Sequence, residues 1–301
     1  MAQYGMLRGV DAHGAQQRKG RDRAARDQSG DTRTVCDGER DSQSRIDFKG
    51  QSRSCHWSGR QFGSQYRTQA GHRRGERDYI IAVRDLLQNG QTVYRGRRNR
   101  FIWPRPEMRQ RIPICVTAEG PRMLRLAGEV GDQVLIGTGL TSEIVEASLQ
   151  QLHEGAKAAE RDPDELEVWW APRLSIAENR EKALKDIRAS IASSGNHALR
   201  SGLAGKYVPD LLKESIRRFH QEYDYSQHGE KTGKNARLID QLGLTEYLLD
   251  RFAVAGTPGD IVQRIRSLAR LGLKNLWLSS PGDDPSNLDL MGREVLPHLN
   301  D

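Results

Sequence analysis

Hydrophobic and polar positions follow two different patterns along this 301-residue chain, and the change falls near residue 77. From Tyr79 to Leu87, apolar residues recur at helical spacing, and Asn89–Gly90 supplies the glycine that commonly ends a helix. Before residue 77, arginine, glycine, serine and glutamine predominate, as in SGRQFGSQYRTQAGHRRGE at residues 58–76. The later pattern indicates a folded domain, whereas the earlier one lacks regular apolar positions.

Strands and helices are predicted to alternate after residue 77. The pattern predicts a hairpin at residues 92–103 and then four buried strands, at residues 112–118, 133–139, 165–177 and 276–280. Helices are expected to start at Pro121, at Thr141 or Ser142, at Asn179, at Thr257 and at Asn287. This alternation implies parallel strands with right-handed crossovers, which is an α/β fold. Periodicity alone does not separate an open sheet from part of a barrel.

Charge is distributed as unevenly as hydrophobicity. Residues 1–77 contain 16 Lys and Arg against 9 Asp and Glu, and residues 78–301 contain 31 of each. The whole net charge of +7 therefore comes from the first quarter of the chain. No stretch is long and apolar enough for a membrane span or a signal peptide, so a soluble, cytoplasmic protein without a membrane partner is expected.

Cysteine and histidine residues give little support to a catalytic or metal site. Cys36, Cys55 and Cys115 are widely spaced and odd in number, which argues against a disulfide framework, and no metal role is expected. The later histidines are interpreted as solvated, since none is paired in sequence with a nucleophile or second ligand: His153, His197, His220, His228 and His298. Trp169 and Trp170 are interpreted as core residues rather than as a substrate pocket. GTP at residues 256–258 is interpreted as a helix cap, not a nucleotide motif.

Three separated segments resemble one enzyme family. IPICVTAEGPRMLRLAGEVGDQVLIGTG is similar to the central segment of the luciferase-like oxidoreductases, especially the deazaflavin-dependent branch that includes methylenetetrahydromethanopterin reductase. FAVAGTPGDIVQRIRSLARLGLKNLWLSSP resembles the C-terminal segment of that family, and VYRGRRNRFIWPRP its hairpin. The resemblance covers about residues 77–301 and implies a (β/α)8 TIM barrel of which strands five to eight are readable here. Residues 194–250 would be a helical insertion.

The resemblance also implies where a cofactor would bind. The family holds a flavin or deazaflavin at the C-terminal mouth of the barrel, with the loops after the strands holding its phosphate. By position these loops correspond to Thr117, Ala118, Glu119 and Gly120 after the fifth strand, and to Gly137, Thr138 and Gly139 after the sixth. Glu119 departs from this pattern, because a carboxylate beside a phosphate repels it. The catalytic positions of the family come largely from its first four strands, so no catalytic residue is assigned.

A reading-frame shift explains the boundary near residue 77. Codons can be chosen for Cys55–Glu76 that, read one base later, give AIGVGDSSVRNIGLKPATVEE, which resembles the fourth strand of the family. The same shift turns Asp27–Gly38 into TNPVTRAPSVTA, similar to the segment after its third strand. Residues 11–76 are therefore interpreted as frameshifted. The alternatives are a disordered basic arm or an unrelated domain.

Two functions follow from these interpretations. The first is a luciferase-like oxidoreductase that performs hydride transfer or monooxygenation on a small molecule with coenzyme F420 (a deazaflavin) or FMN, without a nucleic-acid partner and with homo-oligomerisation left open. Whether the chain is active as given also stays open. The second is a non-catalytic half-barrel whose basic arm binds nucleic acid or an acidic partner. Without readable early strands, residues 1–76 are expected to lack regular packing, and the strands at 112–118 and 276–280 are expected to be bare sheet edges.

Overall fold

The computed structural model describes residues 3–8, 45–46, 52–57, 73–102, 111–200, 202–282 and 285–299. Three strands precede residue 77: β1 (Gln3–Arg8), β2 (Arg45–Ile46) and β3 (Ser52–Trp57). The expectation that this segment contains no regular structure is therefore wrong for these strands. A strand needs partners for its backbone N–H and C=O groups more than it needs apolar side chains, which is why composition missed them. The remainder of residues 1–72 lies outside the described residues.

The rest of the chain alternates between strands and helices, as the pattern predicts. The strands are β4 (Gln91–Tyr94), β5 (Arg97–Arg100), β6 (Ile114–Ala118), β7 (Gln133–Ile136), β8 (Glu167–Trp170), β9 (Arg173–Ile176), β10 (Ala253–Gly256) and β11 (Asn275–Ser280). The helices are α2 (Arg73–Asn89), α3 (Pro121–Val130), α4 (Ser142–Ala158), α5 (Arg180–Leu199), α6 (Lys213–Glu222), α7 (Lys234–Gln241), α8 (Thr245–Phe252), α9 (Pro258–Arg270) and α10 (Ser286–Leu290).

One sheet organises the molecule. Its strand order is β10-β9-β11-β8-β7-β6-β3-β2, with β1 paired to β11. Strands β6, β7, β8 and β11 are parallel neighbours in chain order, as strands five to eight of a barrel would be. The fold is thus α/β with a parallel sheet of the TIM-barrel type, of which this chain carries the C-terminal half.

The edges of this sheet differ from the expectation. Strand β3 pairs in parallel with β6 through Ser54–Trp57, and β1 pairs antiparallel with β11 along its whole length. The prediction that β6 and β11 are bare edges is therefore wrong. A first barrel strand would run parallel to the eighth, so the antiparallel β1 departs from barrel closure.

The predicted strand at 165–177 is in fact two strands. Strand β8 ends at Trp170 and β9 begins at Arg173, with Pro172 between them, because proline has no N–H to donate to a ladder. The break lets β8 pair with β7 and β11, while β9 pairs with β10 and β11. Strand β10 itself was not predicted, since its four residues lie directly between helix α8 and the cap of α9.

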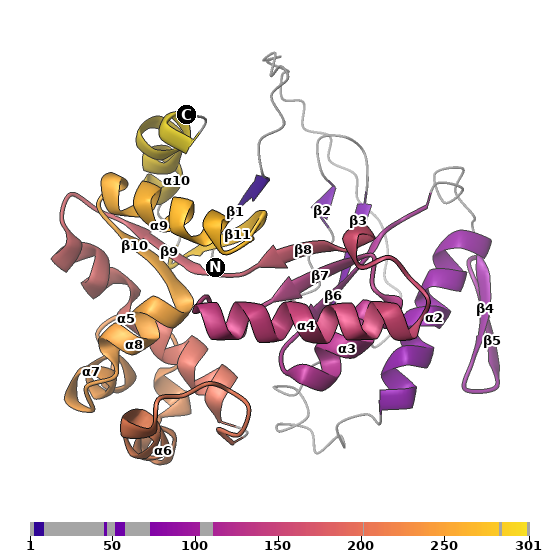
Figure 1. The fold of residues 1–301 in the computed structure, drawn as a ribbon, viewed down its shortest axis with the longest axis horizontal. Coiled ribbons are helices and arrows are strands. Elements are labelled where there is room, and N and C mark those ends of the chain that lie inside the picture. The colour runs from indigo at the N-terminus through magenta and orange to yellow at the C-terminus, as the bar shows by residue number, and fades with distance from the viewer. Residues whose placement is uncertain are drawn as a thin grey trace, which may run out of the picture.

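Helices cover the sheet and form a second core at one end. Figure 1 shows α3 and α4 crossing in front of β6–β8, while α5–α8 gather at the end of the molecule opposite the β4–β5 hairpin. Trp170 belongs to the core beneath the sheet helices, and Ile191 and Phe219 belong to the core between α5 and its neighbours. Trp169 and Trp170 are only 2% and 1% exposed, which confirms their interpretation as core residues. The cap of α9 is confirmed as well, because Thr257 and Asp260 form a complete capping box.

A carboxylate ties the opposite, N-terminal edge of β6 to its surroundings. Asp132 accepts hydrogen bonds from the backbone N–H of Ile114 at 2.8 Å, from Arg84 at 3.2 Å and from Arg111 at 2.6 Å. Burial alone would raise the pKa of Asp132, but the Ile114 N–H and the two guanidinium groups lower it below its ordinary value.

We expect Asp132→Asn to lower the free energy of unfolding by about 2–3 kcal/mol at neutral pH, because it weakens hydrogen bonds to charged donors. A lowered folded-state pKa contributes stability that is complete above the unfolded pKa of about 3.9 and is lost as the pH falls through the folded value. Urea unfolding at pH 7 and pH 3 should therefore show a difference between wild type and variant that shrinks in acid. The exposed Asp289→Asn is the control and should change stability by about 0.5 kcal/mol or less. A difference that stays constant with pH would contradict this assignment.

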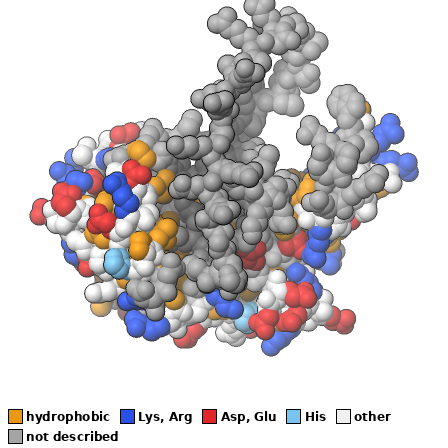
Figure 2. All heavy atoms as spheres, turned by 90° about the horizontal axis from the view of Figure 1, so that it is seen from above, with side chains coloured by type: hydrophobic (Ala, Val, Ile, Leu, Met, Phe, Trp, Pro, Cys, Tyr) orange, Lys and Arg blue, Asp and Glu red, His pale blue; other side chains and the backbone are white. Residues whose placement is uncertain are grey.

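The described surface carries both charge signs. Figure 2 shows acidic and basic side chains interspersed on the face that it presents, in keeping with the equal numbers of both after residue 77. In the described part of the chain, no helix is long and apolar enough to cross a bilayer.

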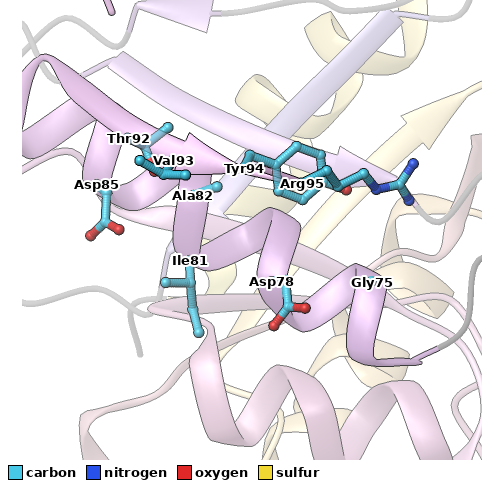
Figure 3. Close-up of a pocket in the computed structure, with 9 residues that line it drawn as sticks. All are labelled: Gly75, Asp78, Ile81, Ala82, Asp85, Thr92, Val93, Tyr94 and Arg95. Atoms are coloured by element: carbon cyan, nitrogen blue, oxygen red, sulfur yellow. The ribbon is translucent and has the colours of Figure 1, made fainter. Parts of the chain in front are cut away.

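One pocket lies between α2 and the β4–β5 hairpin. Asp78, Ile81 and Asp85 of α2 line one side, and Tyr94 and Arg95 of the hairpin line the other (Figure 3). None of the residues predicted to bind a cofactor lines this pocket. The candidate site is therefore built from the strand ends, which lie elsewhere in the molecule.

Candidate functional site

The C-terminal end of β6 leads directly into helix α3. Thr117 and Ala118 are the last residues of β6, and Glu119 and Gly120 form the turn. Gly120 has a φ angle of 96°, which favours glycine, and no atom lies within 4 Å of the position that a Cβ would take. Pro121 then starts α3, so the positive end of the helix dipole lies at this open turn.

The loop after the neighbouring strand β7 is filled by other side chains. A Cβ on Gly137 would lie 2.9 Å from Oε1 of Glu119, and a Cβ on Gly139 would lie 2.7 Å from Cγ of Arg251. The carbonyl of Thr138 accepts a hydrogen bond from Nε of Arg251 at 3.1 Å. The structure thus brings the two sequence-predicted segments together at adjacent strand ends. The glycines after β7 make room for Glu119 and Arg251.

Glu119 forms a close pair with a histidine from a distant helix. Its Oε2 lies 2.6 Å from Nε2 of His197, near the end of α5. The side chains are 29% and 24% exposed, so the pair is shielded but still reached by solvent. A carboxylate oxygen and an imidazole nitrogen at this distance are within hydrogen-bonding range, so the pair links the turn after β6 to α5.

Basic groups lie around this pair. Arg173 at the start of β9 donates hydrogen bonds to Ser194 at 3.1 Å and to Ser279 at 2.9 Å, which links α5 to the end of β11. His228 shares a hydrogen bond of 2.8 Å with the hydroxyl of Tyr223. Partial burial of the His228 ring, together with the positive charges of Arg173, His197 and Arg200, lowers its pKa. Arg173, His197 and Arg200 therefore lie close enough to His228 to disfavour its protonation.

Arg251 is the most deeply buried charge at this end of the sheet. It is 2% exposed, and its other hydrogen bonds go to the Lys206 carbonyl at 2.7 Å and the Tyr247 hydroxyl at 2.6 Å. Burial lowers its pKa, although Tyr247 opposes that shift. Within the described residues, none of these partners is a carboxylate. The Arg251 guanidinium thus acts as a clamp that connects α8 to the β7 loop through hydrogen bonds to uncharged acceptors.

The solvated interpretation is wrong for His197 and His220, which are partly buried and have side-chain partners, whereas His228 is exposed although it also has a partner. His197 pairs with Glu119, His228 bonds to Tyr223, and Nδ1 of His220 lies 3.0 Å from Oδ1 of Asn196. Burial, assisted by the nearby Lys206 and Arg200 charges, lowers the pKa of His220 to about 4, so this ring is neutral at physiological pH. Sequence spacing missed these pairs because most of their partners come from other helices and loops.

The site residues fit the phosphate of a flavin or deazaflavin only in part. The open turn at Gly120, at the start of a helix, suits an anion. At Gly137, however, the Glu119 carboxylate already occupies the adjoining space. Within the described residues, no cluster of histidine, cysteine, aspartate or glutamate could hold a metal ion, and Cys115 is buried and forms no disulfide there.

The family of this chain follows from its sequence as well as its fold. The sequence profile of the luciferase-like monooxygenase family matches residues 59–275. The chain therefore belongs to the luciferase-like monooxygenase family, whose members are oxidoreductases. The matched range begins inside the segment 11–76, earlier than the resemblance at residues 77–301 indicated.

The relatives of this chain include a methylenetetrahydromethanopterin reductase and an F420-dependent dehydrogenase. The chain is 26% identical over 231 residues to 5,10-methylenetetrahydromethanopterin reductase of Archaeoglobus fulgidus, covering 74% of this chain and 65% of that protein. It is 28% identical over 229 residues to the F420-dependent glucose-6-phosphate dehydrogenase of Nakamurella multipartita, covering 74% and 59%. The chain thus spans less than two thirds of the length of these relatives.

Solved structures support the same fold. The coenzyme F420-dependent tetrahydromethanopterin reductase from Methanopyrus kandleri superposes with a TM-score of 0.56 at 23% identity, covering 77% of this chain and 65% of that one. An F420-dependent secondary alcohol dehydrogenase, in complex with an F420–acetone adduct, gives a TM-score of 0.53 at 17% identity, covering 76% and 62%.

Proposed function

We propose that this protein is an oxidoreductase that uses coenzyme F420 or FMN to transfer a hydride to or from, or to oxygenate, a small organic substrate. The observation that carries the proposal is the meeting of the β6 and β7 loops at the C-terminal edge of the parallel sheet, in a chain of the luciferase-like family. Ligands of parallel α/β folds bind at this edge. The cofactor would supply the redox chemistry, and the protein would supply binding and orientation.

The residues that would hold the cofactor are those of the two loops. The turn at Gly120 and the first turn of α3 offer N–H groups to a phosphate, and Thr117, Ala118, Gly137, Thr138 and Gly139 shape the adjoining strand ends. A cytoplasmic location and residues 194–250 as a family insertion over the mouth remain part of this proposal.

The frameshift interpretation belongs to the same proposal and has its own test. The gene sequence should contain two compensating insertions or deletions, near codons 11 and 76. Stop codons in the shifted frame through that interval would exclude the interpretation.

We expect cofactor binding to depend on the frame of residues 11–76. Strand β3 pairs in parallel with β6, at the place that a fourth barrel strand would take, so the segment whose frame is in question adjoins a strand of the proposed site. A chain with the shifted frame restored should bind F420 or FMN at least about tenfold more tightly than the chain as given, which corresponds to about 1.4 kcal/mol. Fluorescence titration of both chains with both cofactors measures this.

Each negative outcome of that titration has a separate meaning. Equal affinity of the two chains would contradict the frame interpretation but not the enzyme class. Absence of binding by a folded, frame-restored chain would contradict the oxidoreductase proposal itself.

A further inference from the structure

We infer that Glu119 is an internal anion that occupies the phosphate position between β6 and β7 and thereby decides which ligands enter the mouth. The inference concerns how the proposed cofactor site selects ligands, so it rests on the proposed function. Its experiment uses inorganic phosphate, so that it can fail or succeed independently of cofactor binding.

The position of the Glu119 side chain is the first observation. Its Oε1 lies 2.9 Å from the place of a Cβ on Gly137, so the carboxylate lies directly over the glycine backbone at the end of β7. A phosphate oxygen approaching that backbone would need the same space. It would also meet a like charge at contact distance, which weakens anion binding by a factor of ten or more even at a partly solvated site.

The surrounding basic groups are the second observation. Glu119 is held by His197 at 2.6 Å, and the charges of His197, Arg173 and Arg200 all act on His228. The carboxylate is therefore paired with a histidine that lies near two arginines, Arg173 and Arg200. Without the charge of Glu119, the open helix start at Gly120 would no longer have a carboxylate in the adjoining residue.

The two members of the pair should consequently behave differently when each is replaced. Glu119→Gln removes the negative charge, keeps the size of the side chain and leaves His197 in place, so phosphate should bind about tenfold more tightly. His197→Gln removes the holder but leaves the negative charge, so phosphate affinity should not increase. If the Glu119–His197 pair only held the turn after β6 against α5, both substitutions would change the phosphate affinity in the same way.

The experiment measures the unfolding temperature of the full chain over a series of inorganic phosphate concentrations, with chloride at matched ionic strength as reference. A ligand that binds the native state raises this temperature according to its concentration relative to its Kd. Glu146→Gln is the matched control, because it removes one carboxylate from the exposed face of α4 and should leave the phosphate response unchanged. The double variant Glu119→Gln/His197→Gln gives a second reading should the single variant fail to fold.

The inference predicts different phosphate affinities for these variants. A phosphate response in Glu119→Gln, or in the double variant, that exceeds wild type, His197→Gln and Glu146→Gln by about tenfold in affinity supports the inference. An unchanged response in both Glu119 variants overturns it, and so does an equal gain in His197→Gln. Titration with FMN and with riboflavin, which lacks the phosphate, adds a direct readout: Glu119→Gln should tighten FMN but not riboflavin. If neither FMN nor riboflavin binds any variant, the FMN alternative of the proposed function fails, while the phosphate response still decides the role of Glu119.

Discussion

Replacing Arg251 with alanine should lower the free energy of unfolding by about 3–5 kcal/mol. The change leaves the carbonyls of Thr138 and Lys206 and the Tyr247 hydroxyl without their buried donor, and each unsatisfied group costs about 1–3 kcal/mol. The cavity left by a side chain that is 2% exposed adds to this cost, while relief of a buried charge offsets part of it. Urea unfolding followed by circular dichroism measures the difference.

Arg264 provides the matched control. It also donates to a backbone carbonyl, that of Asp250 at 2.6 Å, and pairs with the Asp250 carboxylate at 3.0 Å. Because its side chain is 27% exposed, water replaces the lost partners, and Arg264→Ala should cost about 1 kcal/mol or less. The loss in the free energy of unfolding for Arg251→Lys should lie between those of the two alanine variants, since lysine keeps the charge but not the planar arrangement of N–H donors. Equal losses in both alanine variants would contradict the clamp role of Arg251.

Gly155→Ala should destabilise the protein by about 3 kcal/mol, although alanine is the better helix former by about 1 kcal/mol. Helices α3 and α4 pack with their backbones in direct contact at two glycines. A Cβ on Gly155 would lie 2.0 Å from the carbonyl oxygen of Arg125, and a Cβ on Gly128 would lie 2.1 Å from that of Leu152. The obstacle is backbone rather than a flexible side-chain end, so the helices must separate and the steric cost exceeds the propensity gain.

Gly259→Ala is the control in which alanine should gain helix propensity without a steric cost. Gly259 lies in the first turn of α9, and the nearest atom to its Cβ position is Oγ1 of Thr257 at 3.9 Å. Alanine should therefore be neutral or stabilise by up to about 1 kcal/mol. Thermal and urea unfolding of both variants should give opposite signs, and a stabilised Gly155→Ala would show that the close α3–α4 contact does not exist.

Both predictions bear on the candidate site because both elements position it. Arg251 fixes the loop that contains Thr138 and Gly139, and the contact between α3 and α4 fixes the helix that starts at Gly120.

Local sequence patterns were sufficient for several elements of the fold. Pro121 and the Thr257–Asp260 pair marked helix starts because capping needs particular residues within one turn. The segments at 117–120 and 137–139 were placed after the fifth and sixth strands by the resemblance to the luciferase-like family, and the structure has β6 and β7 as neighbouring parallel strands. The break at Pro172 was visible in the sequence as well, yet its effect on pairing was not.

What the sequence by itself determined is therefore the alternation of parallel strands and helices and the caps of the helices, since these depend on periodicity and on residues close together in the chain. Tertiary structure alone decided the Glu119–His197 pair, the Arg251 clamp on Thr138 and the antiparallel β1–β11 pairing. In each of these contacts the partners are tens to hundreds of residues apart, and no local propensity encodes them. They arise because packing of the sheet and helices brings groups together whose charge and hydrogen-bonding capacity must then be satisfied by one another.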